Sequence, residues 1–235
     1  NGCASSMRRS AGTTQSWDEI IASIGLRRLG LKDLAGPDER AALLYHPAVS
    51  GDLILASRSP RRADLLTAAG YQFTVEPADI DEQLHPGESP STHVARLAEE
   101  KARVVAAAHQ RALVLGADTV VVVDGDVLGK PASDAVASSM LERLSGRTHE
   151  VLTGVSLIEG DWTRCEVAST EVTFRSLTPG EIGWYVESGE PAGKAGAYAI
   201  QGRASRFVTG IVGSYSNVVG LPIALVDSLI RSRDW

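Results

Sequence analysis

The sequence has few cysteines, no long hydrophobic run and no excess of positive charge. Its 235 residues include only two cysteines, Cys3 and Cys165, which are too far apart to suggest a disulfide framework or a zinc motif. This scarcity favours a reducing compartment, and we expect a cytoplasmic protein. No segment approaches the roughly 20 apolar residues that a membrane-spanning helix needs, so we expect a soluble protein without a membrane partner.

The charge balance also excludes a class of partners. Lys and Arg number 23 against 29 Asp and Glu, which gives a net charge of −6. This balance argues against general attraction to nucleic acid or anionic lipid, so any anion site must be local. The five histidines show no metal-ligand spacing. We interpret each as a surface residue or a satisfied residue: His46, His85, His93, His109 and His149.

Residues 1–50 differ in composition from the rest of the chain. They begin with a Ser- and Arg-rich piece without an acidic residue before Asp18, which faintly resembles a transit peptide but has no apolar secretory core. Apolar spacing from Trp17 favours an amphipathic helix until Gly36-Pro37 interrupts it. We predict a partly disordered or helical extension over residues 1–50 and a folded domain over residues 51–235.

Residues 53–62 read Leu-Ile-Leu-Ala-Ser-Arg-Ser-Pro-Arg-Arg and predict a strand that leads directly into a helix. Ser59-Pro60 combines an N-cap residue with the proline favoured in the first helical turn. Free N–H groups and the helix dipole favour an anion there, whereas Arg61 and Arg62 are unfavourable without one. The stretch therefore indicates either an anion site or an ordinary connection with solvated arginines.

Three charged positions downstream could complete such a site. The acidic residues of the loop 78–89 are usually only solvated, but one could point inward and hold a divalent cation. Lys101 falls among the apolar positions of a helix that begins at Pro90, so its ammonium either reaches solvent or points into a cleft. Asp118 lies in an aliphatic run, where burial requires an ion pair, a metal or satisfying backbone amides.

The remaining patterns predict strands and helices in alternation. We expect strands over 113–123, broken at 116–119, and a long hairpin of residues 148–158 and 162–174. Ser133 and Thr178-Pro179 predict further helix starts. Since long hairpins exclude a purely parallel sheet, we predict a mixed β-sheet with flanking helices in two lobes around a cleft.

Two further polar residues could face the same cleft. Gly129-Lys130-Pro131 lacks the length and the Ser/Thr of a phosphate-binding P-loop, yet Lys130 could lie opposite Asp118. In the glycine-rich segment 193–202, the backbone could approach a ligand closely, and Gln201 could both donate to and accept from a base edge. Such segments are also often merely turns.

Seven motifs occur in order along the chain: Ala-Ser-Arg-Ser-Pro-Arg-Arg, Arg-Leu-Ala-Glu-Glu-Lys-Ala, Gly-Ala-Asp-Thr-Val-Val, Gly-Lys-Pro, Ser-Gly-Glu-Pro, Lys-Ala-Gly-Ala-Tyr-Ala-Ile-Gln-Gly and Val-Val-Gly-Leu-Pro. With them, residues 53–232 resemble the Maf family of nucleotide pyrophosphatases. This resemblance implies hydrolysis of a nucleoside triphosphate between the α and β phosphates with a divalent metal. It also implies the fold of inosine triphosphate pyrophosphatases and a homodimer.

The resemblance also implies roles for individual residues. The matching phosphate-binding residues are Ser57, Arg61 and Arg62, and the matching charged residues are Glu82, Lys101, Asp118 and Lys130. Asp118 matches the proposed general base, and Asp118 with Glu82 would hold Mg²⁺ or Mn²⁺.

Three positions concern the choice of substrate. Arg61, Thr119 and Gln201 match the branch that acts on dTTP and UTP in nucleotide house-cleaning. The branch that acts on 7-methyl-GTP resembles this chain less. A nucleotide sensor without turnover, or an interaction protein of the division septum, stays open as an alternative.

Overall fold

The computed structural model describes residues 52–234. The predicted extension over residues 1–50, with its helix from Trp17, lies outside the described residues. Within them, seven strands form one sheet in the order β2-β1-β3-β5-β6-β7, and β4 also pairs with β3. The strands are β1 (Leu53–Leu55), β2 (Thr74–Val75), β3 (Leu113–Val123), β4 (Asp126–Leu128), β5 (Thr148–Glu159), β6 (Trp162–Phe174) and β7 (Val208–Val212).

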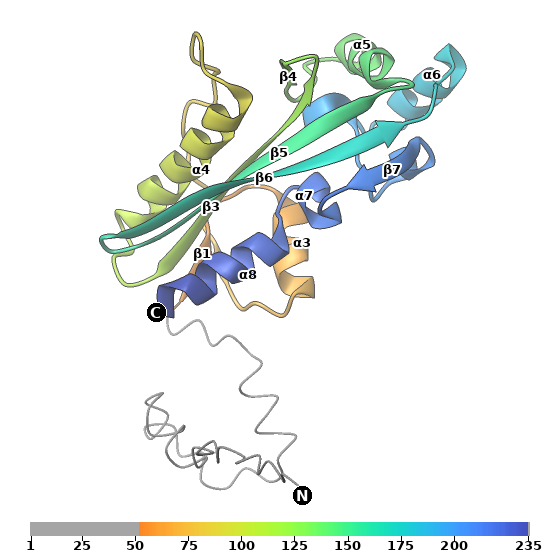
Figure 1. The fold of residues 1–235 in the computed structure, drawn as a ribbon. Coiled ribbons are helices and arrows are strands. Elements are labelled where there is room, and N and C mark those ends of the chain that lie inside the picture. The colour runs from red at the N-terminus through yellow and green to blue at the C-terminus, as the bar shows by residue number, and fades with distance from the viewer. Residues whose placement is uncertain (1–51, 235) are drawn as a thin grey trace, which may run out of the picture. The chain divides into compact units, whose positions relative to one another are not determined.

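The sheet is mixed, as predicted. Strand β1 pairs in parallel with β2 and β3, whereas the pairs β3–β5, β5–β6 and β6–β7 are antiparallel. Figure 1 shows the long strands β3, β5 and β6 side by side, with helices on both faces. The predicted mixed sheet with flanking helices is therefore confirmed.

The helices begin largely where local capping signals predict. They are α3 (Pro60–Ala68), α4 (Pro90–Ala106), α5 (Asp134–Leu144), α6 (Pro179–Glu187), α7 (Tyr215–Val219) and α8 (Ile223–Arg231), with short 3₁₀ turns η3 (Ala195–Ala197), η4 (Arg203–Arg206) and η5 (Ser232–Asp234). The side chains of Ser89, Ser133 and Thr178 each accept a backbone N–H of the following turn. None of the described helices is long and apolar enough to cross a membrane.

Helix α4 packs directly against one face of the sheet because two strand residues lack a side chain. A Cβ atom added to Gly116 on β3 would lie 2.1 Å from the carbonyl oxygen of Ala98. A Cβ atom added to Gly154 on β5 would lie 2.1 Å from the carbonyl oxygen of Val94. Helices α3 and α8 lie on the opposite side of the sheet (Figure 1).

The structure corrects two details of the sequence analysis. The break predicted at residues 116–119 is wrong, because β3 stays paired with β5 through Asp118 opposite Gly154 and Thr119 opposite Thr153. The interpretation of every histidine as exposed or satisfied holds only in part for His149. Its Nε2 lies 2.8 Å from the Tyr198 hydroxyl, whereas its buried Nδ1 has no hydrogen-bond partner within residues 52–234.

Candidate functional site

The site lies at a gap along one edge of β3. On this edge β1 pairs as far as Leu115, and β4 begins to pair at Val121. Strand β5 occupies the opposite edge throughout, from Val114 to Val122. Asp118 and Thr119 lie in the gap between β1 and β4, and their side chains point to opposite faces because strand residues alternate. Groups from both faces of the sheet can therefore meet at this gap.

A cavity of about 620 Å³ lies at the gap, and residues from eight segments of the chain line it. All nine residues singled out from the sequence are among them: Ser57, Arg61, Arg62, Glu82, Lys101, Asp118, Thr119, Lys130 and Gln201. Residues separated by more than 140 positions thus face one space.

Lys101 connects the two candidate metal-binding carboxylates. Its side chain is only 8% exposed, and its Nζ lies 2.7 Å from Asp118 Oδ1 and 2.6 Å from Glu82 Oε1. Lys130 extends the row, because its Nζ lies 3.1 Å from Glu82 Oε2. Of the two directions left open for Lys101, the ammonium takes the one into the cleft. Asp118 is accordingly held by an ion pair.

The two lysines keep Glu82 ionised. Partial burial of Glu82 acts to raise its pKa, but hydrogen bonds and positive charge from Lys101 and Lys130 outweigh burial and lower the pKa to about 2. The carboxylate is therefore negative throughout the neutral range. Glu82 is thus an acidic residue of the loop 78–89 that points into the cavity.

The donor set fits a hard divalent cation that is shared with a substrate. Asp118 and Glu82 supply carboxylate oxygens, and no described residue donates a hydrogen bond to Asp118 Oδ2. Among residues 52–234, no group of three or more His, Cys, Asp or Glu side chains is arranged to hold a metal ion. Because Mg²⁺ commonly uses one or two carboxylates together with phosphate oxygens and water, these two carboxylates suit a metal that arrives with phosphates.

Arg62 is buried in the wall of the cavity and joins three segments. Its Nε donates to the Gly220 carbonyl at 2.7 Å, and its Nη1 donates to Ser57 Oγ at 2.9 Å. Its Nη2 donates to Thr119 Oγ1 at 2.9 Å. Burial lowers the pKa of Arg62, while the charge of Asp118 opposes this change. These three acceptors are one carbonyl and two hydroxyl groups, and none of them carries a charge. Its hydrogen-bond partners therefore do not neutralise the guanidinium, whose positive charge is available to an anion in the cavity.

The first turn of α3 adds further anion-binding groups. The Ser59 side chain makes no capping hydrogen bond, and Ser57 Oγ instead accepts the Ser59 N–H at 3.2 Å. The cavity is lined here by Ser59, Pro60 and half-buried Arg61, whose Nε lies 3.4 Å from the Val219 carbonyl. An exposed helix N-terminus beside two arginines is suited to bind phosphate.

Several cavity residues were not singled out from the sequence, among them Lys194, Tyr198 and Gly220. Lys194 is half-buried, and its pKa is lowered first by burial and then by the charge of Arg61. Tyr198 and Gly220 also line the cavity. Lys194 lies between Gly193 and Gly196, in the glycine-rich segment that also contains Gln201. This glycine-rich pattern is the sequence signal that could have identified it. Gly220 lies in the Val-Val-Gly-Leu-Pro motif, but its role as acceptor for Arg62 comes from tertiary contact.

Comparisons with known proteins agree over this part of the chain. Residues 52–233 match the family model described as Maf-like protein. The chain is 53% identical over 179 residues to a dTTP/UTP pyrophosphatase of Myxococcus xanthus, which covers 76% of this chain and 91% of that protein. It is 54% identical over 171 residues to the dTTP/UTP pyrophosphatase of Symbiobacterium thermophilum, covering 73% and 88%. The Ham1 protein of Staphylococcus aureus aligns in three dimensions with 13% identity and a TM-score of 0.47, covering 77% of this chain and 99% of that structure.

Proposed function

This chain belongs to the Maf family, and from that premise we propose that it hydrolyses dTTP and UTP to the nucleoside monophosphate and pyrophosphate. The observation that carries the proposal is the gathering of arginine and lysine side chains, among them Arg61, Arg62, Lys101 and Lys130, and a helix N-terminus around Asp118 and Glu82 in one cavity. The name of the relatives, dTTP/UTP pyrophosphatase, supports the choice of nucleotide. The activity would serve house-cleaning of nucleotide pools.

The cations suit a triphosphate in number and kind. A triphosphate carries about four negative charges near neutral pH, and guanidinium and ammonium groups are the usual phosphate partners in proteins. Arg61, Arg62 and the first turn of α3 would bind phosphate oxygens. Lys101 and Lys130 both pair with Glu82 in the cavity. We expect their positive charges to stabilise the negative charge that develops on the departing pyrophosphate.

Asp118 is the proposed general base. Its Oδ1 is held by Lys101 and the residue lines the cavity, so its carboxylate could accept a proton from the attacking water. Asp118 and Glu82 would also hold Mg²⁺ or Mn²⁺, which supplies charge neutralisation for the phosphates when it is bound. The ion pair with Lys101 orients the carboxylate for either task.

Two of the residues that match the dTTP/UTP branch act differently in this proposal. Gln201 is exposed in the cavity, where its amide could donate to and accept from a pyrimidine edge. Thr119 accepts a hydrogen bond from Arg62 and lies 3.0 Å from Thr153 Oγ1, so we assign it to positioning Arg62.

Pyrophosphate release from dTTP, UTP, CTP and 7-methyl-GTP, with Mg²⁺ or Mn²⁺, tests the proposal. We expect dTTP and UTP to be preferred, and Asp118→Asn to lose about 100-fold or more in kcat, as is typical when a general base is removed. Asp64→Asn changes an exposed carboxylate on α3 and serves as the control.

Other outcomes would change the assignment. Preference for 7-methyl-GTP would overturn the branch, and unchanged turnover by Asp118→Asn would overturn the role of that residue. Nucleotide binding without release of pyrophosphate would favour a sensor. Absence of nucleotide binding would favour an interaction protein of the division septum.

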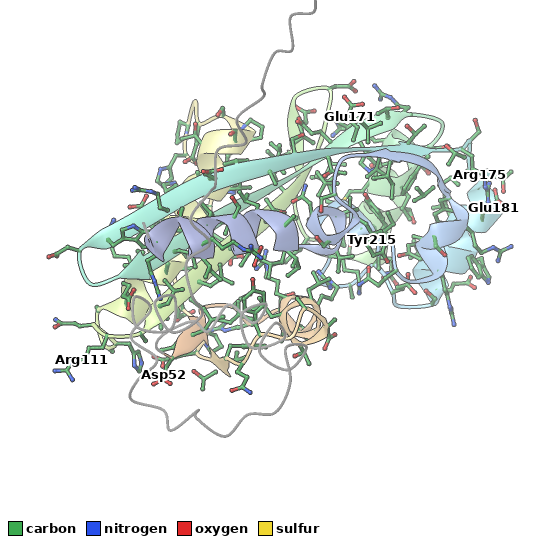
Figure 2. The ribbon with its side chains drawn as sticks, turned by 60° about the horizontal axis from the view of Figure 1, so that its bottom comes forward. Asp52, Arg111, Glu171, Arg175, Glu181 and Tyr215 are labelled. Atoms are coloured by element: carbon green, nitrogen blue, oxygen red, sulfur yellow. The ribbon has the colours of Figure 1, made fainter. Side chains whose placement is uncertain are left out.

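We also propose that the protein is a homodimer and is located in the cytoplasm. A dimer is supported by exposed apolar side chains on two successive elements: Val212 on the edge strand β7 is 71% exposed, and Tyr215 on the following helix α7 is 50% exposed (Figure 2 labels Tyr215). Light scattering of the purified chain should give twice the mass of one chain. A single-chain mass would contradict the dimer.

A further inference from the structure

The glycine-rich segment 193–202 contributes much of the cavity wall but has little regular structure of its own. Lys194, Tyr198 and Gln201 from this segment face the cavity. Its regular structure is the three-residue turn η3, and its backbone has positive φ at Gly193, Gly196 and Ala197. Neither a long helix nor a strand ladder therefore holds Gln201 in place, and contacts from neighbouring residues must do so.

The carboxylate of Glu190 joins the two ends of this segment. Its Oε2 accepts the backbone N–H of Arg203 at 3.1 Å, and its Oε1 accepts the hydroxyl of Tyr185 at 2.9 Å. A Cβ atom at residue 202 would lie 2.4 Å from Glu190 Oε1, so the glycine leaves room for the carboxylate in this position. Residues 190 and 203 are thereby connected across the base of the segment.

Tyr185 holds the middle of the same segment. Its hydroxyl accepts the backbone N–H of Ala199 at 3.1 Å while it donates to Glu190. The side chain is fully buried on α6, and burial raises the pKa of its hydroxyl, which therefore keeps its proton. Helix α6 is itself fixed by the Thr178–Glu181 capping box and by the Arg175–Glu181 ion pair at 2.7 Å (Figure 2).

We propose that Tyr185 and Glu190 are positioning residues that hold segment 193–202, and through it Gln201, in the conformation that selects the base. Neither residue lines the cavity, so each would act through the backbone at Ala199 and Arg203. This inference rests on the proposed function, because Gln201 is given the base-reading role there. It assigns base selectivity to a pair of contacts outside the substrate site.

The kinetic test uses Tyr185→Phe and Glu190→Gln. Phenylalanine removes only the hydroxyl, and glutamine replaces one of the two acceptor oxygens with a donor group. We expect KM for dTTP to rise about 10-fold with kcat changing less than about 3-fold, because base contacts contribute to binding of ground state and transition state alike. The preference for dTTP over dCTP should fall. Glu187→Gln, which neutralises an exposed carboxylate on the same helix, should match wild type.

A double-mutant cycle with Gln201→Ala separates positioning from general weakening. If the pair acts through Gln201, Tyr185→Phe should cause little further loss of dTTP/dCTP preference once Gln201 is alanine. Full additivity of the two losses would overturn the proposal, and so would unchanged preference in both single variants.

Hydrogen exchange of the free protein provides a readout that needs no nucleotide. Amides of residues 191–203 should exchange at least about 10-fold faster in Tyr185→Phe than in Glu187→Gln, while those of β5 stay unchanged. Equal exchange in the two variants would overturn the positioning role. Faster exchange in a protein whose wild type does not hydrolyse dTTP would support the positioning of the segment and overturn the proposed function alone.

Discussion

At the scale of single residues, Lys101 determines the charge pattern of the cavity. It is the shared partner of Asp118 and Glu82, and it lies on the otherwise apolar face of α4. A buried carboxylate that loses its partner keeps the cost of desolvation without the compensating attraction. The lysine therefore supports the folded state and fixes the carboxylate of the proposed general base in place.

Replacing Lys101 with methionine should lower the free energy of unfolding by about 3 kcal/mol, because Asp118 is left as an uncompensated buried charge. Urea denaturation near neutral pH measures this change. Lys130→Met is the matched control: the Lys130 side chain is 61% exposed, so its loss should cost less than about 1 kcal/mol. Adding Asp118→Asn to Lys101→Met should recover much of the loss, and equal stability of Lys101→Met and wild type would contradict the argument.

At the scale of elements, the site depends on how closely α4 approaches the sheet. Gly116 and Gly154 lie on neighbouring strands and contact the backbone of α4. Since α4 carries Lys101 and β3 carries Asp118, the distance between these elements sets the length of their ion pair. The glycines therefore position the proposed catalytic groups without lining the cavity themselves.

Gly154→Ala should destabilise the protein by about 3 kcal/mol or more, because the added Cβ would meet a backbone carbonyl that cannot rotate away. It should also lower turnover by displacing Lys101. Thermal and urea unfolding with parallel pyrophosphate assays measure both effects.

Gly183→Ala is the control for this substitution. Gly183 lies inside α6 with nothing within 4 Å of an added Cβ, so alanine should stabilise the protein by about 0.5–1 kcal/mol. Destabilisation of both variants by similar amounts would show that the approach of α4 is not the cause.

At the scale of the whole molecule, several ionisable groups make stability depend on pH. The pKa of Glu181 is lowered to about 2, mainly by the hydrogen bond from Arg175, and that of Glu82 is also about 2. Stability from such carboxylates is present above their unfolded pKa near 4.5 and is lost as pH falls toward 2. His149 acts at higher pH, because burial lowers its pKa from 6.5 to about 4.

The histidine contribution can be isolated with His149→Gln. Folded His149 binds fewer protons than the unfolded chain between pH 6.5 and about 4, so the free energy of unfolding should fall with decreasing pH by up to about 1.4 kcal/mol per unit. The variant should lack this slope and differ from wild type most near neutral pH. Urea unfolding across this window measures it, and parallel pH profiles would contradict the assignment.

The sequence by itself determined the features that depend on neighbouring residues. Ser89, Ser133 and Thr178 cap helices through backbone groups within three positions, so their patterns predicted where α4, α5 and α6 begin. The motif resemblance also identified nine of the residues that line the cavity, and a mixed sheet followed from the long hairpin.

Only the tertiary structure decided how those residues are used. Arg62 meets Gly220 from 158 positions away, and Lys101 turns into the cleft because Asp118 and Glu82 converge there from separate segments. The unbroken β3, the approach of α4 to Gly154 and the contacts of Glu190 with Tyr185 likewise depend on packing and pairing across elements. Such contacts leave no periodicity in the local sequence, because the free energy that favours them arises only when distant segments pack together.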